Sequence, residues 1–95
     1  MLNSIDVYKL SSLLGSINLI DIRSVEKYNT SHINTSINIP ANILLNNPSK
    51  YLNKNETYYL YCQRGFSSSK VCKTLSLLGY KMINVLGGYE SWLLK

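Results

Sequence analysis

Short apolar runs and segments of helical periodicity alternate along the whole chain. The run TYYLY at 57–61 is β-branched and aromatic and follows polar residues, which is typical of a strand. Farther on, Val71, Leu75 and Leu78 recur at helical spacing and predict a helix with one buried face. The whole pattern predicts strands at 17–22, 37–40, 57–61 and 81–86, and helices at 7–14, 25–28, 41–45, 67–78 and 89–94.

The predicted helices begin and end at residues that suit these positions. Asp6 and Ser24 are placed to cap the N-termini of the first two helices. Gly15 and Gly79 are placed to end the first helix and the helix 67–78, since glycine readily adopts the left-handed conformation found there. The three serines at 67–69 offer an N-cap to the helix 67–78.

Strands separated by helices favour βαβ units, in which neighbouring strands run parallel. We therefore expect an α/β fold: a single domain over 1–95 with about five strands in a mainly parallel sheet and helices on both faces. Ligands of such folds bind outside the carboxyl ends of the strands. Cys62 occupies that place, directly after the strand 57–61.

Composition narrows the classes of protein that remain. Hydrophobic residues make up 45% of the 95 residues, enough for one core, while two cysteines and one histidine exclude a disulfide scaffold and a zinc finger. No apolar run is long enough to span a membrane, and the N-terminus lacks the pattern of a signal peptide. We expect a soluble protein of a reducing compartment, the cytoplasm, without metal or membrane partner.

The net charge of +5 could indicate a nucleic-acid partner, but the basic residues are spread along the chain and form no block. Arg64, Lys70 and Lys73 alone lie close together, near Cys62. A small anionic ligand explains that grouping better than a phosphate backbone, so we expect no nucleic-acid partner.

The segment that follows Cys62 has the properties of an anion-binding loop. It leads from a strand into a helix, so consecutive backbone N–H groups and the helix N-terminus face the sulfur and favour the thiolate. Gly65 permits a tight loop, and Arg64 and Lys70 add positive charge. Cys62 is therefore a candidate nucleophile. The alternative is an inert buried cysteine, which is common at the end of a strand.

Three segments in this order resemble the rhodanese-like (sulfurtransferase) family, as a single-domain member: LIDIRSVEKYNTSHINTSINIP, YCQRGFSS and NVLGGYESW. They are similar to the family's LIDVR, EY, GHI and NIP stretch, its cysteine loop and its terminal GG and Trp segment. Ser31 and the pair Thr35-Ser36 replace a glycine and a Gly-Ala of the family pattern. Many members carry arginine where this chain has Ser67, and Arg64 precedes that place instead.

The resemblance implies a rhodanese-like fold and sulfur transfer through a persulfide on Cys62. It also implies a substrate-binding anion loop, a small anionic sulfur donor such as thiosulfate, and cyanide, a thiol or a protein as acceptor, with no metal or organic cofactor. The loop residues are Gln63, Arg64, Gly65, Phe66, Ser67 and Ser68. A sulfur-relay module that serves a dedicated protein partner is the alternative. A phosphatase would need an arginine where Ser68 stands.

Four other residues have alternative roles. Asp21 and Arg23 end the strand 17–22 on the same sheet edge as the cysteine loop, and either could contribute to a pocket rim. We expect Arg23 to pair with Glu26, since a partly buried arginine usually needs a carboxylate. His32 fits a structural turn better than catalysis, and Cys72 fits the core better than a resolving thiol.

Overall fold

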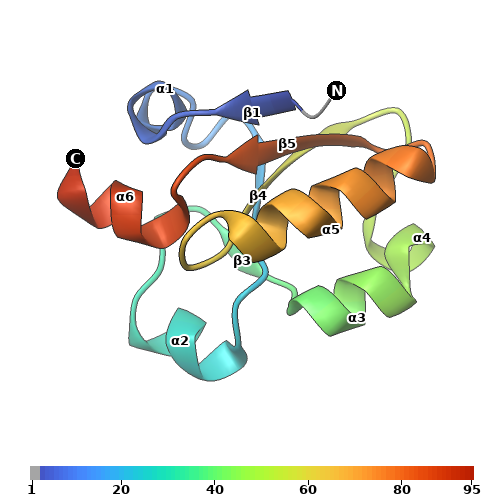
Figure 1. The fold of residues 1–95 in the computed structure, drawn as a ribbon, viewed down its shortest axis with the longest axis horizontal. Helices are drawn as coiled ribbons and strands as arrows, with labels where there is room; N and C mark the ends of the chain where they lie inside the picture. Colours follow the sequence, from blue (N-terminus) through green and yellow to red (C-terminus); the bar gives the residue numbers. More distant parts are fainter. Residues whose placement is uncertain (1–2) are drawn as a thin grey trace.

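The computed structural model describes residues 3–95, and its centre is a five-stranded sheet (Figure 1). Every neighbouring pair of strands is parallel, in the order β1-β5-β4-β2-β3. This confirms the predicted α/β fold with a parallel sheet. The strands are β1 (Asn3–Ile5), β2 (Asn18–Asp21), β3 (Ile37–Asn38), β4 (Thr57–Tyr61) and β5 (Lys81–Val85).

Helices cover both faces of this sheet, as predicted. They are α1 (Val7–Ser11), α2 (Val25–Thr30), α3 (Ala41–Asn46), α4 (Pro48–Tyr51), α5 (Phe66–Leu77) and α6 (Gly88–Leu94). The core on one face contains side chains of α3, α4 and α5, and the core on the other contains side chains of α1 and α6. No helix within residues 3–95 is long and apolar enough to cross a membrane.

The alternation along β4 explains why this strand has these bounds and which way Cys62 faces. Tyr58, Leu60 and Cys62 belong to the core on the α5 face, while Tyr59 and Tyr61 pack on the α6 face. Successive side chains of a strand point to opposite faces, so an aromatic strand buried on both sides needs apolar residues at every position. Cys62 therefore leaves the strand on the side where α5 begins.

Some boundaries differ from those predicted. β1 was not predicted, because a segment of three residues with a single apolar side chain, Ile5, has no strand pattern of its own, and pairing with β5 makes it a strand. The first helix ends at Ser11, and Gly15 lies in a later turn with φ of 90°. The turn of α4, which begins at Pro48, was also missed.

The predicted N-caps have mixed outcomes. The carboxylate of Asp6 accepts a hydrogen bond from Lys9 N at 2.8 Å, and the hydroxyl of Ser24 accepts one from Lys27 N at 3.3 Å. The serine cap predicted for the helix after Cys62 is wrong. That helix begins at Phe66 with Gly65 as its N-cap, which leaves the serines inside its first turns.

Candidate active site

The sulfur of Cys62 lies where the loop after β4 turns into α5. Gly65 N donates a hydrogen bond to Cys62 Sγ at 3.1 Å, and Ser68 N donates another at 3.2 Å. Ser68 is the third residue of α5, so its N–H belongs to the first turn, where helical N–H groups have no partner in the helix itself. The sulfur is therefore cradled by backbone donors and by the positive end of a helix dipole.

A left-handed residue allows the loop to fold back in this way. Gly65 has φ of 93°, a conformation that strains any residue with a Cβ. A Cβ at this position would also lie 2.9 Å from Gly87 N. The glycine predicted from the sequence is therefore required both by its backbone conformation and by the close approach of the turn after β5.

The N-terminus of α6 holds the loop from the other side. Tyr89 N donates to Cys62 O at 2.9 Å, and Glu90 N donates to Gln63 O at 3.0 Å. Gly88 sits against this contact, and a Cβ there would lie 2.4 Å from Cys62 O. With both carbonyl groups held by α6, the amide groups of the loop are free to point towards the sulfur.

A buried hydroxyl lies next to the sulfur within the protein, and a buried amide lies behind the hydroxyl. The hydroxyl of Ser68 lies 3.3 Å from Cys62 Sγ, and it donates a hydrogen bond to Asn84 Oδ1 on β5. Asn84 Nδ2 in turn donates to Gly65 O at 3.4 Å. Sequence reasoning missed Asn84, because a lone asparagine in a strand gives no sign of the helix residue that it faces.

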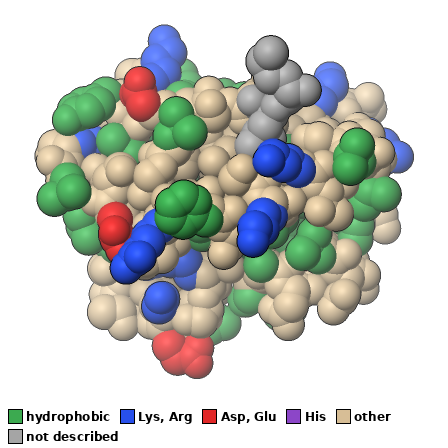
Figure 2. Space-filling view, in the orientation of Figure 1, with side chains coloured by type: hydrophobic (Ala, Val, Ile, Leu, Met, Phe, Trp, Pro, Cys, Tyr) green, Lys and Arg blue, Asp and Glu red, His purple; other side chains and the backbone are tan. Residues whose placement is uncertain are grey.

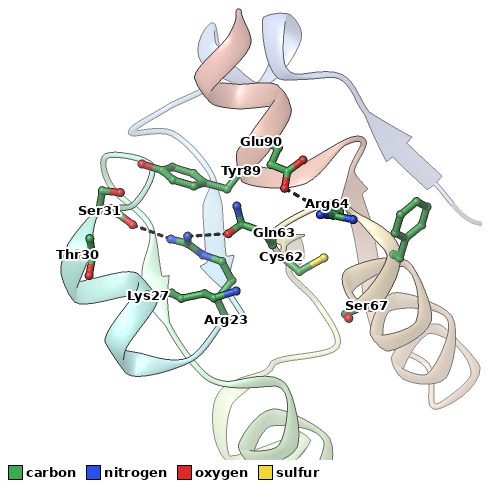
Figure 3. A pocket seen from close by; sticks show the side chains of 11 residues that line it. Arg23, Lys27, Thr30, Ser31, Cys62, Gln63, Arg64, Ser67, Tyr89 and Glu90 are labelled. Atoms are coloured by element: carbon green, nitrogen blue, oxygen red, sulfur yellow. Dashed lines mark hydrogen bonds and ion pairs between the residues drawn. The ribbon is translucent and has the colours of Figure 1, made fainter.

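A cavity of about 730 Å³ opens in front of the sulfur (Figure 3). It is lined by residues in and around α2, by the cysteine loop with the start of α5, and by α6, which are far apart in the sequence: Arg23, Lys27, Thr30, Ser31, Cys62, Gln63, Arg64, Phe66, Ser67, Tyr89 and Glu90. Among the predicted loop residues, Gln63, Arg64, Phe66 and Ser67 line this cavity, whereas Gly65 and Ser68 shape the loop around the sulfur.

Arg23 pairs with Asp21, and the predicted pairing with Glu26 is wrong. Its guanidinium contacts both carboxylate oxygens of Asp21 at 2.7 to 3.1 Å and also donates to Ser31 O at 2.7 Å. Glu26 is exposed on α2, whereas Asp21 is buried beside the guanidinium. Burial would lower the pKa of Arg23, but the hydrogen bonds and charge of Asp21 outweigh burial and raise it.

Only one residue of this buried pair, Arg23, lies in the cavity wall. Asp21 is fully buried and does not line the cavity, whereas Arg23 does, so only the arginine lies where a pocket rim was expected. The guanidinium also lies 4.3 Å from the ring centre of Tyr89 and donates to Gln63 Oε1 at 3.2 Å. Arg23 thereby connects β2 to the cysteine loop and to α6.

Arg64 lies at the mouth of the cavity and is paired loosely. Its Nε lies 3.1 Å from Glu90 Oε2, and the side chains of the two residues are 70% and 46% exposed. In Figure 3 this contact bridges the cysteine loop and α6 above Cys62. A carboxylate near the loop was not expected, because Glu90 is distant in sequence and reaches it only through the α6 contact.

The remaining candidates have structural contacts. His32 Nδ1 lies 2.8 Å from Tyr28 O, and its ring stacks on that of Tyr28, in keeping with the predicted structural role. Cys72 is fully buried in the core beneath α5, as predicted. Burial, followed by the charge of Cys62, raises the pKa of the Cys72 thiol to about 12. This thiol is therefore protonated at neutral pH.

Five further residues that were not predicted line the cavity: Lys27, Thr30, Ser31, Tyr89 and Glu90. The Gly87-Gly88 pair was a usable signal for the last two, since a glycine turn brings a helix N-terminus close to another backbone.

On the face shown in Figure 2, lysine and arginine side chains are spread over the surface, with exposed hydrophobic side chains among them.

The parallel α/β fold and the cysteine cradled by backbone N–H groups at the end of a central strand agree with the family resemblance of the three sequence segments. The family model of the Rhodanese-like domain matches residues 6–95. The chain belongs to this family.

Its relatives include enzymes that transfer sulfur. The thiosulfate sulfurtransferase PspE of Escherichia coli is 33% identical over 72 residues, which are 75% of this chain and 69% of that protein. YrkF of Bacillus subtilis, named as a candidate sulfur carrier protein, is 32% identical over 78 residues. That match covers 81% of this chain but 42% of YrkF, so the chain spans less than half the length of that relative.

Solved structures confirm the fold. The crystal structure of SSP1007 from Staphylococcus saprophyticus has a TM-score of 0.89 and 30% sequence identity to this chain. The match covers 96% of this chain and 93% of SSP1007. The rhodanese-like fold expected from the three sequence segments is therefore confirmed.

Proposed function

We propose that the protein is a sulfurtransferase that takes sulfur from a small anionic donor such as thiosulfate and holds it as a persulfide on Cys62. The observation that carries the proposal is the pair of N–H donors from Gly65 and Ser68 on a sulfur that faces an open cavity. Donors fixed in advance stabilise negative charge on sulfur without reorganising during the reaction. Because such a cradle favours the thiolate, no separate general base is required.

The proposed reaction has two displacements. The Cys62 thiolate attacks the outer sulfur of thiosulfate, a new S–S bond forms, and the old S–S bond breaks with its electron pair leaving on sulfite. An acceptor such as cyanide then attacks the outer sulfur of the persulfide, giving thiocyanate and regenerating the thiolate. Lys27 and Arg64 line the route to the sulfur and would attract the anionic donor. Both cysteines are free, which suits the reducing cytoplasm where we place this chemistry.

Intact-mass measurement after treatment with thiosulfate tests the proposal. We expect the protein to gain the mass of one sulfur atom and to lose it when cyanide is added, with thiocyanate formed. Cys62→Ser should abolish both results. Cys72→Ser is the matched control and should retain them, because the Cys72 thiol is buried and protonated. Loss of transfer in a folded Cys72→Ser protein would reverse the assignment.

A sulfur-relay role is the second candidate, and the similarity to YrkF favours it. In that role Cys62 would receive or deliver sulfur only when a dedicated protein partner is present. The exposed ring of Phe66, 72% accessible at the cavity mouth, would suit contact with such a partner. Turnover with thiosulfate and cyanide alone supports the enzyme. A persulfide that forms but reacts only with a protein thiol supports the relay.

A further inference from the structure

Ser68 and Asn84 form a buried polar pair beside the nucleophile, and neither lines the cavity. They are 0% and 3% exposed. Asn84 lies on β5, where it pairs with Leu60 of β4, two residues before Cys62. Met82, two residues earlier on β5, belongs to the core on the α5 face, so Asn84 also faces α5. Sheet register and helix position thus bring the asparagine, the serine and the cysteine together.

The hydroxyl of Ser68 has one hydrogen and three acceptors within reach. Asn84 Oδ1 lies 2.5 Å from Ser68 Oγ, whereas Gly65 O and Cys62 Sγ each lie 3.3 Å away. The hydrogen therefore goes to the nearest acceptor, Asn84. The oxygen of Ser68 is left facing the sulfur with its lone pairs, so it accepts a hydrogen bond from the Cys62 thiol.

The amide of Asn84 is held in this orientation by the loop. Its Nδ2 donates to Gly65 O at 3.4 Å. Turning the amide over would bring its oxygen against that carbonyl oxygen, and both are acceptors. The arrangement in which Asn84 Oδ1 accepts from Ser68 therefore satisfies both ends of the amide.

This hydrogen-bond chain suits the thiol form of Cys62 better than the thiolate. When the thiol loses its proton, Gly65 N and Ser68 N still donate to the sulfur, but the hydroxyl oxygen turns lone pairs towards a negative charge. The hydroxyl can donate to the thiolate only by leaving Asn84, whose buried oxygen then loses its donor. Asn84, Gly65 O and the sulfur therefore compete for one hydrogen, and Asn84 is the nearest of the three.

We propose that Asn84 is a positioning residue that acts through the Ser68 hydroxyl and limits how much of Cys62 is thiolate in the resting protein. The inference deepens the proposed function, because it concerns the nucleophile of that same site. A stronger acceptor at position 84 holds the hydrogen more firmly and lowers the thiolate fraction. A side chain without an acceptor leaves the hydrogen to Gly65 O or to the sulfur, and the thiolate, as the charged acceptor, binds it more strongly, so the thiolate fraction rises.

The rate of alkylation of Cys62 by iodoacetamide, measured against pH by intact mass, tests this inference, since the thiolate is the reacting form. Two substitutions of similar size change the hydrogen-bond acceptor at position 84 in opposite directions. Asn84→Leu removes the acceptor and should raise the rate at neutral pH about fivefold, the equivalent of one neutral hydrogen bond. Asn84→Asp supplies a charged acceptor and should lower the rate about tenfold or more, with recovery at higher pH.

The Ser68→Ala background is the control, because it shows whether residue 84 acts on the sulfur through the Ser68 hydroxyl or in some other way. Without the hydroxyl, Asn84→Leu should no longer change the rate, and the effect of Asn84→Asp should shrink to the repulsion between its charge and the sulfur. The other ionisable groups around the sulfur are unchanged in every variant: Arg23, Lys27, Arg64, Cys72 and Glu90. If Asn84→Asp does not fold, the two single variants Ser68→Ala and Asn84→Leu and their double variant are sufficient to test the inference.

Three results would overturn the inference. Asn84→Leu and Asn84→Asp could change the rate in the same direction, as a purely structural role would. Asn84→Leu could slow alkylation, which would mean that the amide donates to Ser68. The effect of Asn84→Leu could also persist in Ser68→Ala. The titration uses no sulfur donor, so its result is independent of whether the protein transfers sulfur.

Discussion

Two arginines line the same cavity, and each is paired with a carboxylate, yet the two pairs differ in almost every physical respect. The side chains of Arg23 and Asp21 are 5% and 0% exposed, and the guanidinium makes further contacts with Ser31 and Gln63. The side chain of Arg64 is 70% exposed and has one contact with Glu90. The first pair builds the wall of the cavity, whereas the second leaves a cation free to meet a ligand.

The difference follows from the cost of removing charge from water. A buried ion pair is stable only as a complete unit, because deleting one partner leaves an uncompensated charge in the interior. An exposed pair contributes about 0 to 1 kcal/mol, since water solvates either partner when the pair opens. The three substitutions below test this contrast.

The largest effect is expected for Arg23→Leu, which leaves the Asp21 carboxylate buried without its partner. We expect the free energy of unfolding to fall by about 3–5 kcal/mol, measured by chemical denaturation. Glu26→Gln, which changes an exposed carboxylate near Arg23 in sequence, is the control and should change stability by less than about 0.5 kcal/mol. Equal losses in the two variants would contradict the assignment of Asp21 as the partner.

Arg64→Ala should have the opposite profile, with little change in stability and a clear change in kinetics. We expect KM for thiosulfate to rise about tenfold and kcat to fall less, since the charge acts on the donor before and during the reaction. Lys70→Ala removes the same charge from the exposed surface of α5, outside the cavity lining, and should change KM far less. Unchanged kinetics in Arg64→Ala would favour partner docking as its role.

The smallest effect is expected for Glu90→Gln, which frees Arg64 from its carboxylate. KM for thiosulfate should fall about two- to fivefold, in line with the strength of an exposed ion pair. High salt should remove the difference, because it screens both charges. In an Arg64→Ala background the substitution should have a weaker effect. A Glu90→Gln effect of the same size in that background would show that Glu90 acts on the donor directly.

The same contrast shows which features of the fold could be predicted. β4 was predicted with its correct bounds, because its side chains pack on both faces of the sheet, and such a strand is a continuous run of β-branched and aromatic residues in the sequence. β1 was missed, because three residues with one apolar side chain become a strand only by pairing with β5. The local sequence pattern was sufficient to predict β4, whereas β1 is defined by its pairing with β5, which is distant in sequence.

The residues of the site also differ in whether local sequence or tertiary contacts place them. Cys62 and Gly65 could be placed from the loop alone, since a strand, a glycine and a helix start follow one another directly in the sequence. The partner of Arg23 was wrong, because Glu26 has the right spacing but lies on an exposed helix, whereas Asp21 is buried beneath the guanidinium. Asn84 could not be predicted, because it reaches the loop only through tertiary packing, whereas the Gly87-Gly88 pair was the one available sign of Glu90.

The contacts between α6 and the cysteine loop also bear on the order in which the site is made during protein synthesis. Tyr89 N and Glu90 N hold the carbonyl groups of Cys62 and Gln63, but the ribosome adds these residues well after the cysteine. Until α6 has been synthesised, these two carbonyl groups lack the N–H donors that hold them in the folded protein. The donors Gly65 N and Ser68 N are synthesised soon after the cysteine, whereas the contacts that hold the loop around them come only with α6.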